Sequence, residues 1–214
     1  RGVPCSDPIA AGPTIPAAGE KALKNHVNLR KVFKLVKKMR GKTKIAFILM
    51  TYYNTIYRFG LKKFISTCKN NGIDGIIIPD LIPEEGSSLI KLGRKNKINI
   101  IFLLSPISDF KRIKLVSKLS SGFIYCVSLT GVTGERARIP DIKNYLNRVR
   151  RIVKKPLVVG FGVSKNSQVK EVLKYADGVI IGSEIIKMIM KNIKNRNPVK
   201  STGNFIKELK RGVA

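Results

Sequence analysis

Two glycine-bearing turns near the end of the chain have the residue types of an anion-binding site. Residues 160–164 (G-F-G-V-S) and 182–184 (G-S-E) each follow an apolar run and precede a helical stretch. Glycines let backbone N–H groups approach an anion, and a helix N-terminus favours negative charge. The alternative for the first turn is a tight connection capped by Ser164. Together the two turns predict phosphate binding, and neither has the Walker-type lysine motif of a nucleotide site.

A third loop and two aspartates add further possibilities for a site. Residues 128–135 (S-L-T-G-V-T-G-E) are longer than a tight connection needs, so they form either a lid over a ligand or an ordinary surface loop. Asp7 lies in an opening segment with four prolines before position 17, which exclude a helix start and predict a shaped loop. Asp7 can be catalytic, cap a turn or meet a partner. Asp80, just past an apolar run, is either functional or a cap of the next helix.

The net charge of +29 arises from 42 basic and 13 acidic residues. Such a charge suits a nucleic acid or an anionic membrane. However, the basic residues are scattered over nearly every predicted helix, without a nucleic-acid motif, so we favour lysine-rich compositional drift. No apolar run reaches about 18 residues, which predicts no transmembrane helix. Three unclustered cysteines predict no metal site and indicate a reducing compartment, and the lone His26, in a Lys-rich helical stretch, is interpreted as a surface residue.

The elements that must position these groups are short β-branched runs alternating with amphipathic stretches. Strands are predicted at residues 44–51, 75–80, 99–105, 123–128, 157–160 and 178–181. A 3.6-residue period predicts helices at Leu29/Val32/Phe33/Val36, at Leu61/Phe64/Ile65/Cys68 and at Ile142/Leu146/Val149. Phe205, Ile206 and Leu209 are expected to pack a terminal helix over residues 202–211. This order predicts a parallel sheet in one α/β domain, residues 1–214. Six strands fit either a complete doubly wound sheet or a (β/α)₈ barrel without its first two strands.

These segments together resemble the tryptophan synthase α subunit family along almost the whole chain. The family pattern G-[IV]-P-F-S-D-P-x-A-D-G-P-T-I-Q is similar to residues 2–16, and M-T-Y-Y-N is present at residues 50–54. The pattern P-D-L-P-x-E-E resembles residues 79–85, and S-x-x-G-V-T-G matches residues 128–134. The patterns G-F-G-[IV]-S and D-G-V-I-x-G-S correspond to residues 160–164 and 177–183. The order and spacing of these motifs are those of the family.

The resemblance implies a TIM (β/α)₈ barrel whose first two strands are missing from this chain, N-terminally truncated. It implies retro-aldol cleavage of indole-3-glycerol phosphate to indole and glyceraldehyde 3-phosphate in tryptophan biosynthesis. The resemblance also implies a β subunit as the partner, in an α2β2 tetramer, and a location in bacterial cytoplasm or a plastid. PLP would belong to that partner, and this chain itself is expected to need no cofactor or metal. Residue by residue, the resemblance assigns the phosphate to Gly162, Gly182, Ser183 and the lid residue Gly134. It assigns the substrate pocket to Ile15, Tyr52, Tyr125 and Phe161, lid closure to Thr133, and the β-subunit face to Pro4, Asp7 and Asn54.

Departures from the family pattern predict impaired catalysis. The family's Asp, which stabilises positive charge on the indole ring, falls at Ala11, and the place of its acid–base Glu falls just upstream of Arg1. Cys5 replaces an aromatic residue and Pro16 a glutamine. Each acid–base group contributes about 10²–10⁴ in rate. The alternatives are therefore a barrel that has lost its chemistry but docks on and stimulates a β subunit, and, less favoured, a basic nucleic-acid-binding protein.

Overall fold

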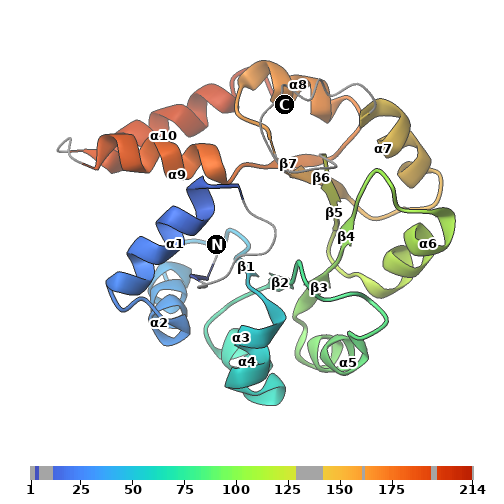
Figure 1. The fold of residues 1–214 in the computed structure, drawn as a ribbon, viewed down its shortest axis with the longest axis horizontal. Coiled ribbons are helices and arrows are strands. Elements are labelled where there is room, and N and C mark those ends of the chain that lie inside the picture. Colours follow the sequence, from blue (N-terminus) through green and yellow to red (C-terminus); the bar gives the residue numbers. More distant parts are fainter. Residues whose placement is uncertain (1–2, 5–11, 129–141, 161, 194–196, 214) are drawn as a thin grey trace. The chain divides into compact units, whose positions relative to one another are not determined.

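The structure, a computed structural model, describes residues 3–4, 12–128, 142–160, 162–193 and 197–213 (Figure 1). Its backbone divides into two units, Arg1–Leu103 with Lys118–Ile124, and Leu104–Ser117 with Tyr125–Ala214. We describe each unit by itself, and the single domain over residues 1–214 stays a prediction. Among the described residues, none of the helices combines the length and the apolar character needed to cross a bilayer.

The first unit contains a parallel sheet of three short strands. Its strands β1 (Ile48–Met50), β2 (Gly75–Ile77) and β3 (Asn99–Ile101) pair in that order, with Met50 opposite Ile77 and Ile77 opposite Ile101. The helices are α1 (Thr14–Lys24), α2 (Leu29–Arg40), α3 (Tyr53–Phe59), α4 (Leu61–Asn70) and α5 (Ser87–Asn96). The periodic apolar residues predicted for α2 are all buried, and so are Phe64, Ile65 and Cys68 of α4. Figure 1 shows α3, α4 and α5 on one side of the three strands.

The second unit contains most of a four-stranded sheet with the order β4-β5-β6-β7. The strands are β4 (Leu103–Leu104), β5 (Ile124–Val127), β6 (Leu157–Gly160) and β7 (Gly178–Ile180). The helices are α6 (Phe110–Leu119), α7 (Ile142–Arg150), α8 (Asn166–Leu173), α9 (Ser183–Asn192) and α10 (Pro198–Leu209). The predicted apolar face of α7 is buried, whereas α10 buries only Leu209 and leaves Ile206 40% exposed. The packing role predicted for Ile206 is therefore wrong.

Three local expectations from the sequence are corrected by the structure. Residues 99–105 form two strands, because the N–H of Phe102 donates to the Ser120 hydroxyl, 3.0 Å away, and interrupts the strand. The opening segment does not exclude a helix start, since α1 begins at Thr14 with Pro13 as its N-cap residue and Pro16 in its first turn. Proline is tolerated there because the first helical N–H groups have no partner in the helix. His26 lies in a turn after α1, at a φ of 54°, rather than within a helix.

An arginine–aspartate arrangement occurs at the amino end of the strands in each unit. Arg40, at the end of α2, hydrogen-bonds Asp74, whose carboxylate accepts the N–H of Phe47 at 2.7 Å. The N–H of Asp74 donates back to the Phe47 carbonyl at 2.9 Å. Because Phe47 precedes β1 and Asp74 precedes β2, the carboxylate holds the beginnings of two neighbouring strands and the end of the preceding helix together.

The second unit repeats this arrangement with different residues. Arg150, at the end of α7, hydrogen-bonds the carboxylate of Asp177, which accepts the N–H of Leu157 at 2.7 Å. The N–H of Asp177 donates to the Leu157 carbonyl at 2.8 Å. Burial raises the pKa of Asp177, but the hydrogen bonds from Arg150 and Leu157 outweigh it and hold this pKa below the ordinary carboxyl value. The ionised form therefore stabilises the start of β6 and β7.

We predict that Asp177→Asn lowers the free energy of unfolding by about 1 kcal/mol at pH 7, since the side chain is half exposed and screened by solvent. Because the folded pKa is depressed, the carboxylate stabilises fully above about pH 4 and loses this effect as pH falls through the folded pKa. Urea unfolding at pH 7 and at low pH measures both values. Glu171→Gln, which removes an exposed pair with Lys174, is the control; a difference between Asp177→Asn and wild type that persists in acid would contradict the assignment.

Candidate functional site

The two predicted phosphate turns leave the same edge of the second sheet. Strands β6 and β7 are parallel and in register, with Gly160 opposite Ile180. The turn with Gly162 follows the first of these residues, and Gly182 and Ser183 follow the second. Gly162 is exposed at a φ of 80°, a left-handed conformation that favours glycine. The structure therefore brings both turns to the carboxyl ends of adjacent strands, where ligands of α/β folds bind.

The two helices that follow these turns differ in how their first N–H groups are used. At α8, the N–H groups of Ser164 and Lys165 donate to the Gln168 side chain at 2.9 and 3.0 Å. The alternative of a cap at Ser164 is wrong, because the N-cap residue is Lys165 and the Ser164 hydroxyl donates to the Gln168 side chain at 3.1 Å. At α9, the N-cap residue is Gly182, and no side-chain cap bond is formed. The start of α9 thus offers amide donors to an anion, whereas the amides of Ser164 and Lys165, just before α8, are already bonded to Gln168.

Tyr125 lies against the end of β6 through a contact that only glycine permits. A Cβ atom added at Gly160 would lie 1.9 Å from the Tyr125 hydroxyl oxygen. The Gly160 carbonyl accepts the N–H and the hydroxyl of Ser128 at 3.1 and 3.0 Å. Burial raises the pKa of Tyr125, so the phenol stays neutral near pH 7. The second unit therefore places the neutral phenol of Tyr125 against Gly160, which is two residues before the predicted phosphate-binding Gly162.

In the first unit, the carboxyl end of β1 carries two of the predicted residues. Tyr52 is the half-buried N-cap residue of α3, and Asn54 is exposed in its first turn. Pro4 lies beside this strand end, because the N–H of the preceding Val3 donates to the Met50 carbonyl at 2.9 Å. Ile15 lies in the first turn of α1 and is half-buried.

The remaining predicted site residues lie outside the described residues. They are Asp7, Ala11, Thr133, Gly134 and Phe161, and with them the predicted lid. Their roles stay predictions. Within the described part of the chain, no three His, Cys, Asp or Glu side chains are grouped as metal ligands.

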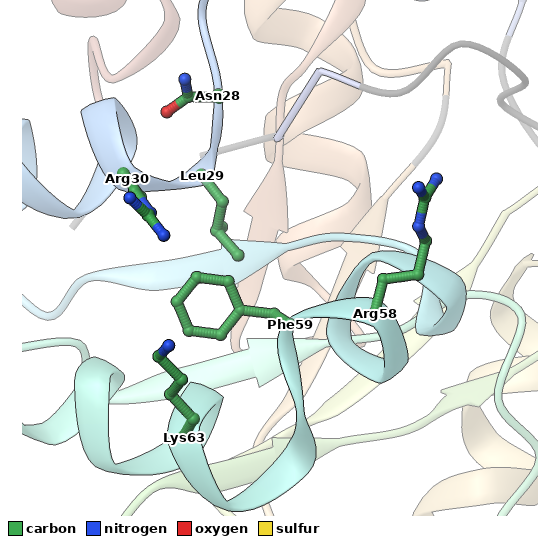
Figure 2. Close-up of a pocket in the computed structure, with 6 residues that line it drawn as sticks. All are labelled: Asn28, Leu29, Arg30, Arg58, Phe59 and Lys63. Carbon is green, nitrogen blue, oxygen red and sulfur yellow. The ribbon is translucent and has the colours of Figure 1, made fainter.

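The structure also has two features that the sequence reasoning missed. Asp80 contacts α3, which lies earlier in the chain than the preceding helix α4, because the N–H of Tyr53 donates to both carboxylate oxygens at 2.9 and 3.0 Å. The expected cap of the next helix is therefore wrong. A hollow of about 440 Å³ lies between the start of α2 and the helices α3 and α4 (Figure 2). It is lined by Asn28, Leu29, Arg30, Arg58, Phe59 and Lys63, none of them a predicted site residue. The sequence signal for this hollow would be a basic residue next to an aromatic one, a pattern too common in this chain to predict a hollow.

We predict that Gly160→Ala destabilises the fold by about 3 kcal/mol, because its methyl group would displace the Tyr125 ring. Gly178→Ala, on the paired strand, is the matched control. There the added Cβ would meet Val158 at 3.6 Å, an ordinary contact, so a change of about 1 kcal/mol or less is expected. Chemical unfolding measures the free energy of unfolding of both glycine variants and of the double mutant Gly160→Ala with Tyr125→Ala. Equal costs for the two glycines, or no relief in the double mutant, would refute this close approach.

Comparison with known proteins gives one consistent match. The sequence model of the family described as tryptophan synthase alpha chain matches residues 1–214. The tryptophan synthase alpha chain of Petrotoga mobilis is 41% identical over 211 residues, which cover 98% of this chain and 80% of that protein. The alpha chain of Aquifex aeolicus is 42% identical over 215 residues, covering 99% and 80%.

A solved structure of the tryptophan synthase α2β2 complex from Pyrococcus furiosus contains a similar chain. It aligns with a TM-score of 0.85 at 35% identity, over 98% of this chain and 83% of that one. This likeness confirms the predicted TIM-barrel fold class. Because the family match extends from the first residue to the last, the chain belongs to the tryptophan synthase α chain family.

Proposed function

We propose that the chain acts as a tryptophan synthase α subunit, a lyase that cleaves indole-3-glycerol phosphate to indole and glyceraldehyde 3-phosphate. The observation that carries this proposal is the in-register ending of β6 and β7, which brings two glycine turns and the uncapped start of α9 to one edge. This edge suits a sugar-phosphate dianion. The relatives that support it are bacterial, and we place the chain in the cytoplasm or, in a eukaryotic host, in a plastid.

The phosphate would be held by the backbone of Gly162, Gly182 and Ser183, with Gly134 closing from the lid. Amide donors at the start of α9 interact with the dianion through hydrogen bonds and through the helix dipole. We also assign Tyr125, which lies next to the end of β6 in the same unit, to the pocket for the organic part of the ligand. We assign the rest of the substrate pocket to Ile15, Tyr52 and Phe161, and lid closure to Thr133.

The cleavage breaks the bond between indole C3 and the adjacent side-chain carbon. The hydroxyl on that carbon loses its proton as the aldehyde forms, and indole C3 gains a proton. The reaction therefore needs acid–base groups and a negative charge near the indole ring. Ala11 stands where the family pattern has an aspartate, and a methyl group cannot neutralise positive charge. We propose that the chain binds the substrate but turns it over slowly.

The partner in this proposal is a tryptophan synthase β subunit, and PLP belongs to that subunit. The solved complex with the similar chain is an α2β2 assembly, which supports this partner. Pro4, Asp7 and Asn54 would face it. The lost charge at Ala11 favours a second candidate function, in which the chain has little lyase activity and serves to dock on and stimulate the β subunit.

We predict that Ser183→Asp weakens binding of glycerol 3-phosphate at least 10-fold, because a carboxylate at the start of α9 repels the phosphate. The matched control is Ser87→Asp, since α5 also begins with serine after an N-cap glycine without a side-chain cap bond. Isothermal titration calorimetry measures both affinities. Unchanged affinity in Ser183→Asp, or an equal loss in Ser87→Asp, would remove the phosphate site from this turn.

We predict that Ala11→Asp, made in a chain extended upstream to include the family's Glu, raises the rate of indole release about 100-fold over the same extended chain with Ala11, the effect of restoring one charged catalytic group. Ala10→Asp, one position earlier in the chain, is the control. Indole formation from indole-3-glycerol phosphate is followed with and without a β subunit. Flat kinetics in Ala11→Asp together with stimulated β-subunit turnover would favour the second candidate function; flat kinetics without stimulation would overturn both.

A further inference from the structure

The carboxylate of Asp80 connects the carboxyl ends of β1 and β2. These strands are in register, with Met50 opposite Ile77, and the N–H of Thr51 extends the pairing by donating to the Ile77 carbonyl at 3.1 Å. Tyr53 lies three residues after the end of β1, and Asp80 lies three residues after the end of β2. The N–H of Tyr53 donates to both carboxylate oxygens of Asp80, at 2.9 and 3.0 Å. The two loops are therefore joined by a charge-assisted hydrogen bond.

Asp80 provides the side-chain acceptor that the first turn of α3 does not contain. The N-cap residue Tyr52 has no side-chain cap bond, and the first turn of α3 contains no acidic residue. A carboxylate at a helix start satisfies an N–H group without a helical partner and complements the helix dipole. Because α3 has only seven residues, it has few helical hydrogen bonds of its own, and the bond to Asp80 fixes its first residue to another loop.

The first turn of α3 carries two residues with different assignments. Tyr52, immediately before Tyr53, is half-buried and is assigned to the substrate pocket. Asn54, immediately after it, is exposed and is assigned to the β-subunit face. The bonded amide of Tyr53 thus lies between a group that would touch the indole ring and a group that would touch the partner.

We propose that Asp80 is a positioning residue, which holds the start of α3 so that Tyr52 meets the indole part of the substrate and Asn54 meets the β subunit. This inference rests on the proposed function. Asp80 acts through the hydrogen bond to Tyr53, so its effect depends on an acceptor oxygen at this place and not on charge alone. It does not act on the phosphate, which is assigned to the other unit.

The test compares Asp80→Ala, Asp80→Asn and Asp109→Ala. Asp109 is the matched control, since its carboxylate accepts the N–H of Arg112 at 2.7 Å at the start of α6. Each alanine variant therefore loses one carboxylate cap of a surface helix. Asparagine at position 80 keeps one acceptor oxygen and removes the charge. Circular dichroism first establishes that all variants are folded at the assay temperature.

Four measurements distinguish a positioning role from simple stabilisation of the fold. The affinity for the β subunit and the affinity for indole-3-propanol phosphate, which contains ring and phosphate but no cleavable hydroxyl carbon, are measured by calorimetry. The affinity for glycerol 3-phosphate, which lacks the ring, is measured alongside. Exchange of the Tyr53 amide proton, followed by NMR, reports the hydrogen bond itself.

We expect Asp80→Ala to weaken binding of the β subunit and of indole-3-propanol phosphate about 5-fold each and to speed Tyr53 amide exchange, the loss expected for one capping bond. The affinity for glycerol 3-phosphate stays unchanged in Asp80→Ala. Asp80→Asn retains most of the affinity that Asp80→Ala loses, and Asp109→Ala matches wild type in all binding. Wild-type affinities in Asp80→Ala, or equal losses in Asp109→Ala, would overturn the inference alone. A wild-type chain that binds neither partner nor ligand would overturn the proposed function and this inference together.

Discussion

In-register pairing of short parallel strands is the constraint on which the site depends. β6 has four residues and β7 has three, so the pairing of Gly160 with Ile180 leaves little freedom in where the following turns begin. A slip of one residue would turn every side chain of a strand to the other face. The position of Gly162 relative to Gly182 and Ser183 is thus a consequence of backbone hydrogen bonds and not of the turns themselves.

The amino ends and the carboxyl ends of the strands differ in the contacts that they make. At the amino edge, Asp74 and Asp177 join strand starts to the ends of α2 and α7 through arginine. At the carboxyl edge of the first unit, Asp80 joins a strand end to a helix start. The carboxyl edge of the second unit instead leaves the first amides of α9 without a side-chain cap. In the second unit, the arginine–aspartate pair therefore lies at the edge opposite the predicted phosphate turns, where the start of α9 has no side-chain cap.

Sequence periodicity predicts the helices that have a buried apolar face, because burial produces the pattern. Every predicted strand occurs, and the apolar faces of α2 and α7 are those that the 3.6-residue pattern indicated. The start of α1 was missed because proline is acceptable in a first helical turn, and the break at Phe102 because it depends on Ser120, distant in sequence. The contact of Asp80 with α3 was missed for the same reason, since local spacing cannot predict a partner on another loop. The roles of Ala11 and Thr133 rest on family resemblance alone.

Three carboxylates have a structural role in this strongly basic chain. The chain has 13 acidic residues against 42 basic ones, and some of the acidic side chains lie on exposed helix faces, as in the Glu20–Lys24 and Glu171–Lys174 pairs. Asp74, Asp80 and Asp177 each accept a backbone N–H from a residue at least 20 positions away, a task that lysine cannot perform because it has no acceptor atom. Basic residues on solvated helix faces have no such restriction. The strongly basic charge is therefore compatible with the architecture, because these three carboxylates lie at the sheet edges, where they join segments that are distant in sequence.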